Sequence, residues 1–271
     1  AGERKVGHAG TLDPMATGLL MLALNRATRL LRFVQDLPKT YLARAVFGVA
    51  TDTLDAEGRV LSREPAAVTE DEVQTVMRRF VGRINQVPPM VSAIKVEGRH
   101  LYQLAREGRE VERDPRSVEV YALEVVDFAP SDYPEVELLV NCSKGTYVRT
   151  LVDDIARGLG SRAHLSALRR VGIGSFAVGE SHSIETMEEA AAQDQLGALV
   201  LSAAMGLRDL PAVKVGGDVE RGVRHGKAFP VPDLGDEVPG HGVFRVLDDE
   251  GTLLAIYRRL ERRAAPEVVV A

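Results

Sequence analysis

The sequence predicts a globular protein that mixes β-strands with α-helices and divides into two domains. Its 271 residues are 45% hydrophobic and 27% charged, which is the composition of an ordinary globular protein with a sizeable core. Strand and helix patterns alternate through most of the chain, whereas short strands with Gly and Pro turns dominate after Leu210. We therefore expect one domain over residues 1–205 and a smaller one over residues 206–271.

Hydrophobic spacing and turn signals place the individual elements. Thr69 followed by Glu72 forms a capping-box pattern, and the apolar positions after it recur at helical spacing. The run "GLLMLAL" is typical of a short buried strand, and "AHLSALRRVGIGSF" of a short helix that turns into a strand. The expected helices cover residues 27–36, 69–82, 101–106, 146–160 and 184–196, and the expected strands cover residues 18–24, 40–51, 117–128, 135–142 and 242–260, the last as a hairpin.

Composition excludes several classes of protein. No apolar run approaches the roughly 20 residues that a membrane span needs. The single Cys142 excludes an internal disulfide, fits a reducing cytoplasm, and is expected to be an inert buried thiol. The six His residues have no metal-binding spacing. "TDTLDAEG" (51–58) lacks the ligand spacing of a calcium loop and is interpreted as a turn.

The net charge of −5 hides an uneven distribution of basic residues. Residues 1–50 hold seven Lys and Arg against three Asp and Glu, residues 76–116 hold nine against five, and residues 144–171 hold six against two. These segments together carry +12, which leaves −17 for the rest of the chain. Either a polyanion binds a basic face, or these are ordinary solvated arginines.

The stretch "VGHAGTLDPMATGLL" (6–20) places Asp13 between glycines and a proline. Asp-Pro is a turn signal, and Gly10 and Gly18 permit backbone angles or close approaches that other residues do not. We expect Asp13 on a constrained loop at the mouth of a buried strand. From the residues alone, a turn aspartate that caps its own backbone remains the alternative to a functional carboxylate.

Residues 86–116 form a long segment rich in Pro, Gly and Arg, with one short helix. Long excursions of this kind are usually functional or mobile. Three further stretches carry candidate side chains: "KTYLA" (39–43), "KGTYVRTL" (144–151) and "LSALRR" (165–170). Each is a weak signal alone, because a strand Tyr is usually core, a helix Arg is usually solvated and a Leu is usually packing.

Together, in this order, the four stretches resemble the TruB family of tRNA pseudouridine synthases, which isomerise the uridine at position 55 in the T loop. The resemblance covers about residues 2–180 strongly and is weaker towards the C-terminus. It implies an α+β fold with a mixed, mostly antiparallel sheet flanked by helices, followed by a small β-rich RNA-binding domain of the PUA type. Family members begin with a strand and helix containing Lys-Pro-x-Gly-x-Thr-Ser, and the chain starts after it with Ala1, so we expect a segment upstream.

The resemblance implies roles for specific residues. Asp13 matches the catalytic nucleophile, Arg149 its ionic partner, and Tyr41 the residue that stacks on the target base. Carboxylates form covalent intermediates at sugar carbons in glycosidases, and a neighbouring cation favours the ionised form. The substrate-binding positions implied are His8, Gly10, Thr11, Lys39, Tyr147 and Leu168, with Arg99, His100 and Arg106 as RNA contacts in an RNA-clamping insertion at about residues 86–116.

The resemblance also implies the partner, which is the T arm and loop of tRNA, bound by a cytoplasmic monomer without an obligate protein partner. No metal or organic cofactor is implied, because the reaction is an isomerisation without redox change. The target uridine must be extruded from the folded loop, at a cost of a few kcal/mol.

Two other classes stay open. A non-catalytic RNA-binding protein could keep the same pocket, although Asp13, Tyr41 and Arg149 together argue against it. A glycosidase-like hydrolase using Asp13 would need a second carboxylate as general acid. Asp153 and Asp154 follow the Arg149 stretch, but we expect them to face solvent.

Overall fold

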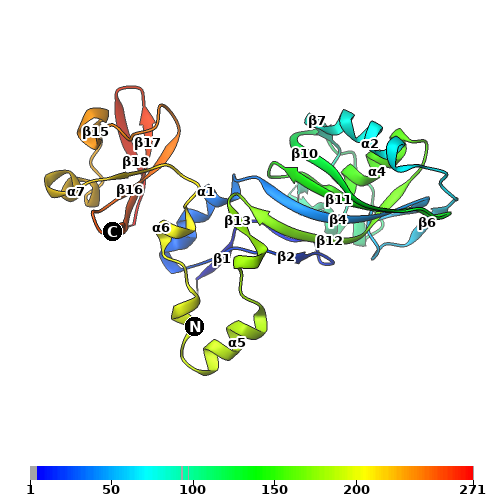
Figure 1. The fold of residues 1–271 in the computed structure, drawn as a ribbon, viewed down its shortest axis with the longest axis horizontal. Coiled ribbons are helices and arrows are strands. Elements are labelled where there is room, and N and C mark those ends of the chain that lie inside the picture. Colours follow the sequence, from blue (N-terminus) through cyan, green and yellow to red (C-terminus); the bar gives the residue numbers. More distant parts are fainter. Residues whose placement is uncertain (1–4, 93, 97, 271) are drawn as a thin grey trace. The chain divides into compact units, whose positions relative to one another are not determined.

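The computed structural model describes residues 5–92, 94–96 and 98–270 (Figure 1). Within them the chain forms two compact units. Unit 1 consists of the described parts of 1–11, 20–35 and 179–271, and unit 2 of residues 12–19 and 36–178. The predicted boundary near residue 205, between domains of residues 1–205 and 206–271, does not coincide with this division into two units and stays a prediction. No described helix has both the length and the apolar character that crossing a membrane requires.

Unit 2 is built on a seven-stranded sheet, counted over the described residues. The order along the sheet is β13-β12-β4-β11-β10-β7, with β2 pairing to β12. All neighbours are antiparallel except β2 and β12, which are parallel. The strands are β2 (Thr17–Gly18), β4 (Lys39–Phe47), β7 (Gly82–Gln86), β10 (Arg116–Ala129), β11 (Glu135–Cys142), β12 (Ala163–Ile173) and β13 (Phe176–Ala177).

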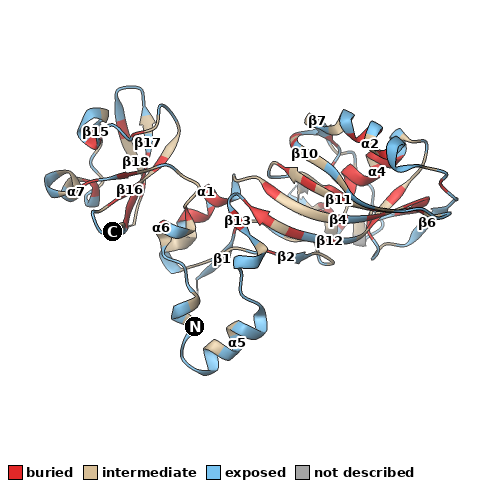
Figure 2. Cartoon of the chain, in the orientation of Figure 1, coloured by how far each residue is buried: buried red, intermediate tan, exposed pale blue. Residues whose placement is uncertain are grey.

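Strand β4 lies in the middle of this sheet, and its alternation determines which face is buried. Lys39, Ala43, Ala45 and Phe47 are buried, whereas Arg44 between them is exposed. Figure 2 colours the sheet by burial. Period-2 burial of this kind is what a sheet with one covered face produces. The same face of the sheet therefore supplies both the core and, near Lys39, the candidate site.

Two helices pack on the buried side of the sheet. They are α2 (Glu70–Met77), extended by a 3₁₀ turn η2 (Arg78–Phe80), and α4 (Val148–Gly158). The predicted capping box of α2 is confirmed, because the Thr69 side chain accepts from Glu72 N and the Glu72 carboxylate accepts from Thr69 N. A Cβ at Gly158 would lie 2.7 Å from Val76 Cγ1, so only glycine permits this approach of α4 to α2.

Four predicted elements differ from the structure. The helix expected over 27–36 is α-helical only in α1 (Leu31–Gln35), and the preceding η1 (Asn25–Leu30) is a 3₁₀ helix. The run 18–24 is not one buried strand: Leu22 is 51% exposed, and only β2 and β3 (Leu22–Leu24) are extended. The expected strand 40–51 breaks at Gly48, which has φ of +80°. The predicted short helix at the start of residues 163–176 is wrong, because β12 pairs with β4 from Ala163 onward.

The smaller elements of unit 2 lie outside the main sheet. A two-stranded ribbon of β5 and β6 follows β4, and the predicted insertion 86–116 carries a second ribbon of β8 and β9 and the short helix α3. The predicted helix 101–106 is confirmed as α3. The bounds are β5 (Val49–Thr51), β6 (Val60–Arg63), β8 (Lys95–Val96), β9 (Arg99–His100) and α3 (Leu101–Arg106).

Unit 1 combines N-terminal pieces with the C-terminal part of the chain. Strands β1 (Val6–His8) and β3 pair, and the C-terminal five-stranded sheet has the order β14-β16-β17-β18-β15. A β-rich C-terminal region is therefore confirmed. The remaining elements are η1 (Asn25–Leu30), α1 (Leu31–Gln35), η3 (Val178–Glu180, at the junction with unit 2), α5 (Ile184–Ala192), η4 (Leu196–Leu199), α6 (Ala203–Gly206), β14 (Ala212–Lys214), α7 (Gly217–Arg224), β15 (Phe229–Pro230), η5 (Val231–Leu234), β16 (Val243–Leu247), β17 (Leu253–Leu260) and β18 (Arg263–Val269).

Candidate active site

Asp13 is the first residue of a tight turn, and the chain after this turn pairs with the sheet through β2. Ala16 N donates to the Asp13 carbonyl oxygen at 2.9 Å, with Pro14 at the second turn position. After this turn, a Cβ at Gly18 would lie 2.2 Å from the Arg170 carbonyl oxygen, so glycine allows the loop to reach β12. The turn is thus as predicted, but the Asp13 side chain points to a guanidinium rather than to its own backbone.

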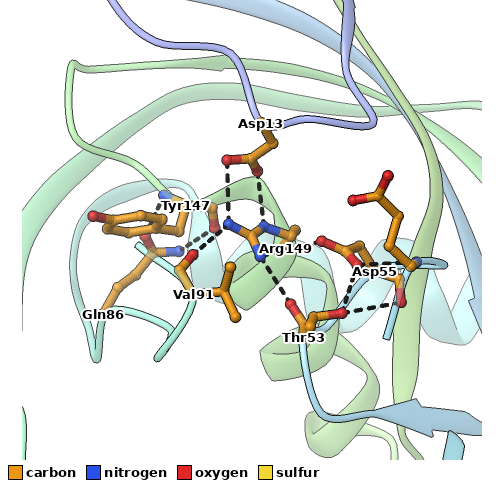
Figure 3. Close-up of polar contacts among 8 residues, drawn as sticks. Asp13, Thr53, Asp55, Gln86, Val91, Tyr147 and Arg149 are labelled. Carbon is orange, nitrogen blue, oxygen red and sulfur yellow. Dashed lines mark hydrogen bonds and ion pairs between the residues drawn. The ribbon is translucent and has the colours of Figure 1, made fainter. Parts of the chain in front are cut away.

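That guanidinium belongs to Arg149, which lies at the centre of the site (Figure 3). Arg149 is 2% exposed and starts from the first turn of α4. Its Nη2 donates to Asp13 Oδ1 at 3.2 Å and to the Val91 carbonyl oxygen at 2.9 Å. Its Nη1 donates to the Thr53 carbonyl oxygen at 2.9 Å and to Asp55 Oδ2 at 3.2 Å. Its Nε forms an ion pair with Asp13 Oδ2 at 2.8 Å, without the alignment of a hydrogen bond.

Asp55 is the second carboxylate of this cluster, and its side chain is only 5% exposed. Its Oδ1 accepts from Thr53 Oγ1 at 2.5 Å and from Glu57 N at 3.1 Å, while Oδ2 faces Arg149. The Asp13 side chain is 31% exposed by comparison. The buried Asp55 carboxylate therefore holds Arg149 inside the protein, and the Asp13 carboxylate is partly exposed to solvent.

Tyr41 and Arg170 face each other across β4 and β12. The two residues are register partners, and Arg170 is 1% exposed with its Nε donating to the Leu19 carbonyl oxygen at 2.7 Å. Burial raises the pKa of the Tyr41 phenol, and the charge and hydrogen bond of Arg170 oppose that rise only in part. The negative charge of Asp13 adds to the increase. Tyr41 is therefore a neutral phenol near the candidate carboxylate.

Lys39 lies two residues before Tyr41 and is 5% exposed. Its Nζ donates to the Leu37 carbonyl oxygen at 2.7 Å. Burial, and next the charge of Arg170, lower the pKa of Lys39 from 10.5 to about 8. Lys39 thus lies as a buried amine on the same face as the site, and its predicted substrate-binding role stays a prediction.

Tyr147 and Leu168, the two predicted pocket-wall residues, lie on different elements. Tyr147 is the N-cap residue of α4, directly before the turn that carries Arg149. Leu168 is 6% exposed and belongs to the core cluster against which Met15 and Tyr41 pack. The roles predicted for both side chains stay predictions.

The predicted RNA contacts of the insertion lie around α3. Arg99 forms a two-pronged ion pair with Glu107, and the His100 ring stacks on Tyr102 with centroids 5.2 Å apart. Arg106 is the last residue of α3, and its side chain lies outside the described part of the chain. In this state, Arg99 would have to exchange a carboxylate for a phosphate to bind RNA.

His8, Gly10 and Thr11 belong to unit 1, and their assignment to the substrate site stays a prediction. His8 ends β1, where its carbonyl oxygen accepts from Gln35 Nε2 at 3.3 Å. Gly10 has φ of +130°, and its N–H donates to His8 Nδ1 at 3.4 Å. The positive φ agrees with the predicted need for glycine at this position.

Two further predictions concern residues outside the cluster. Cys142 is buried, and burial raises the pKa of its thiol to about 11, as expected for an inert thiol. The prediction that Asp153 faces solvent is wrong: its carboxylate is 4% exposed and accepts from Arg157 and Arg162. Asp153 is a structural anchor of α4. Among the described residues, no three His, Cys, Asp or Glu side chains are grouped to hold a metal ion.

Comparison with known proteins identifies the family. Residues 1–148 match the N-terminal domain of the TruB family of pseudouridylate synthases, and residues 149–207 match the C-terminal domain of tRNA pseudouridylate synthase B. The chain belongs to the TruB family. The resemblance indicated by the four sequence stretches is confirmed, and the stretch 6–20 of this TruB chain, which contains Asp13, lies within the first of the two matches.

Curated relatives are similar over most of their length. The tRNA pseudouridine synthase B of Ralstonia pickettii (strain 12J) is 44% identical over 230 residues, which are 84% of this chain and 72% of the relative. The tRNA pseudouridine synthase B of Burkholderia mallei (strain NCTC 10247) is 41% identical over 270 residues, which are 98% of this chain and 88% of the relative.

Solved structures support the fold. A chain of a Cbf5–Nop10–Gar1 complex has a TM-score of 0.74 at 24% identity, covering 99% of the TruB chain and 76% of the solved chain. A chain of an H/ACA ribonucleoprotein bound to a substrate RNA has the same TM-score at 22% identity. The predicted α+β fold with a mostly antiparallel sheet is confirmed.

Proposed function

We propose that the protein converts uridine to pseudouridine at position 55 in the T loop of tRNA, with Asp13 as nucleophile. The observation that carries the proposal is the pairing of Asp13, in the family's catalytic motif, with the buried Arg149. Family membership supports the reaction and the tRNA substrate. The position in the T loop and the residue roles come from the motif resemblance.

The reaction breaks the bond between N1 of uracil and C1′ of ribose and forms a bond between C5 and C1′. In the proposed sequence, an Asp13 carboxylate oxygen attacks C1′ while the uracil leaves with the electron pair of the N1–C1′ bond. The base turns, and C5 bonds to C1′ as the carboxylate leaves. C5 then loses its proton and N1 gains one, so atoms and electrons balance as an isomerisation.

Arg149 serves this sequence by fixing the Asp13 carboxylate and balancing its charge. Its remaining N–H groups are held by Asp55, Thr53 and Val91, so the guanidinium is immobilised before substrate arrives. A preorganised charge of this kind needs no rearrangement during the reaction.

Tyr41 serves by stacking rather than by removing a proton. Burial raises the pKa of its phenol above the ordinary value, so phenolate is scarce near neutral pH. A neutral aromatic ring close to the carboxylate suits a detached uracil.

The tRNA binds through phosphate contacts and through bases extruded from the loop. The basic segment 76–116, which contains the insertion, supplies the phosphate contacts in this proposal, and the β-rich C-terminal region binds the tRNA as well. We further propose that the protein acts as a monomer in the cytoplasm, which its single buried cysteine fits.

The test uses unmodified tRNA transcript with the natural chain and with Asp13→Asn. Pseudouridine is mapped by a chemical adduct that stops reverse transcription, and tRNA binding and free uracil are measured in parallel. We expect the natural chain to modify only the T-loop uridine, and Asp13→Asn to bind tRNA without modifying it. Equal rates for both would remove Asp13 as nucleophile, and free uracil would indicate a hydrolase instead.

A further inference from the structure

Gln86 occupies the point where the insertion leaves the sheet. It is the last residue of β7, and its register partner Arg116 is the first residue of β10. The two ends of the insertion, residues 87–115, are therefore joined to Gln86 and Arg116, which lie side by side in the sheet. Whatever holds Gln86 also holds the base of the insertion.

The Gln86 side chain is held by the backbone of Tyr147 (Figure 3). Gln86 is 1% exposed. Its Oε1 accepts from Tyr147 N at 3.0 Å, and its Nε2 donates to the Tyr147 carbonyl oxygen at 3.3 Å. An amide side chain that pairs with both backbone groups of one residue fixes that residue in two directions. Tyr147 is the N-cap of α4, two residues before Arg149.

A second connection joins the insertion to Arg149 itself. The Val91 carbonyl oxygen accepts from Arg149 Nη2 at 2.9 Å, and the next carbonyl oxygen, that of Ser92, accepts from Tyr102 N in α3 at 3.1 Å. Tyr102 stacks on His100, one of the predicted RNA contacts. Hydrogen bonds thus run from the Asp13 carboxylate through Arg149 and residues 91–92 to α3.

We propose that Gln86 is a positioning residue, which holds Tyr147 and the Arg149-bearing start of α4 in a fixed relation to the base of the insertion. This inference rests on the proposed function. The side-chain hydrogen bonds of Gln86 go to Tyr147, and in this proposal it acts by keeping Arg149 within reach of both Asp13 and Val91. The insertion that binds RNA is thereby held at a fixed position relative to Asp13 and Arg149. The bound target uridine then lies at the correct distance from Asp13.

If Gln86 had only a structural role, its substitution would be expected to affect stability rather than the rate of the chemical step. The middle of α4 is already held by Asp153, which accepts from Arg157 and Arg162. If Gln86 only stabilised the helix, its loss would resemble the loss of Asp153. If it positions Arg149, its loss reduces the rate of the chemical step in folded protein.

The experiment compares Gln86→Met with Asp153→Asn, using excess full-length protein and unmodified tRNA transcript. Methionine keeps the length of the side chain but neither donates to nor accepts from Tyr147. For Gln86→Met we expect the single-turnover rate to fall about ten- to a hundredfold, since small misplacements cost that much, while the Kd for tRNA stays within about threefold. For Asp153→Asn we expect a lower Tm and an unchanged single-turnover rate below the unfolding transition.

A second variant, Gln86→Glu, keeps the acceptor for Tyr147 N but loses the donor to its carbonyl oxygen. Because the ionised carboxylate places a negative oxygen against the Tyr147 carbonyl oxygen in a nearly fully buried position, its rate is expected to fall at least as far as that of Gln86→Met. Natural rates for both Gln86 variants, or a loss no larger than that of Asp153→Asn, would overturn the inference alone. A natural chain that makes no pseudouridine would instead overturn the proposed function, and the inference with it.

Discussion

Arg149 directs its guanidinium at four partners from a position that is almost fully buried. Two are carboxylates, Asp13 and Asp55, and two are backbone carbonyl oxygens, those of Thr53 and Val91. Only the planar fork of arginine can supply donors in these directions at once, whereas lysine offers a single point charge. The two carboxylates differ in exposure: Asp13 is partly open to solvent, whereas Asp55 is buried and holds the arginine.

This difference predicts the effect of Asp55→Asn. The Asp55 carboxylate accepts from Arg149 with one oxygen and from Thr53 Oγ1 and Glu57 N with the other. An amide must place its NH₂ group against one of these sets of donors. We expect a loss of about 2 kcal/mol in the free energy of unfolding and a single-turnover rate about tenfold lower, measured by denaturant unfolding and pseudouridine formation.

The matched control is Asp52→Asn in the same loop. The Asp52 side chain is 42% exposed and accepts from Arg59 N. It should leave both quantities close to those of the natural chain, because solvent replaces its contacts. Equal behaviour of the two variants would contradict the supporting role of Asp55.

Lys39 predicts a dependence of stability on pH. Its folded pKa of about 8 lies below the ordinary 10.5, so between these values the unfolded chain binds more protons. The contribution of Lys39 to stability therefore rises with pH from about 8 to 10.5, and below pH 8 its burial is a cost. We expect Lys39→Met to raise the free energy of unfolding by about 2 kcal/mol at pH 7 and to flatten the rise above pH 8.

Unfolding curves from pH 7 to 10.5 check this expectation, with Lys144→Met as control. The Lys144 side chain is 65% exposed and pairs with Asp36. Its removal should change stability little at any of these pH values. A natural chain whose stability difference from Lys39→Met is constant across the range would remove the pH argument.

At the scale of elements, local signals predicted those parts of the fold that local interactions determine. The capping box of α2 is formed by residues three positions apart, and the strands β10 and β11 follow from apolar alternation. The helix predicted at the start of β12 was wrong because residues 163–168 have apolar spacing that is compatible with a helix. Only their pairing with β4 makes them extended. Long-range pairing of this kind overrides local preference.

The site was predictable to a similar extent. Asp13, Tyr41, Arg149 and Tyr147 lie in stretches whose order and spacing resemble the family, and the structure joins Asp13 to Arg149. Asp55, Gln86 and Arg170 were missed as site residues, since their importance depends on contacts between residues 61 to 151 positions apart. For Asp55, the sequence signal that could have been used was "TDTLDAEG" (51–58). This acidic turn does not fit a calcium loop, and in the structure its Asp55 supports Arg149.

At the scale of the whole molecule, the structure reduces the number of cations that RNA can reach. Lys39, Arg149 and Arg170 are buried, and Arg99 is paired with Glu107. Segment 76–116 keeps several exposed arginines, as do other parts of the described chain. Exposed arginines of this segment that can approach a phosphate are Arg78, Arg79, Arg83, Arg109 and Arg116.

This distribution predicts a moderate salt dependence of tRNA binding. If about four to six phosphates are contacted, the slope of log K against log salt concentration is about −3 to −5, because each contact releases counterions. Binding measured from 50 to 500 mM salt gives the slope directly. Arg109→Gln should reduce its magnitude by about one, whereas Arg59→Gln, an 81% exposed arginine in the turn between β5 and β6, should not. A flat salt response would show that basic residues of this segment do not bind the phosphates, and recognition would then depend on the extruded bases alone.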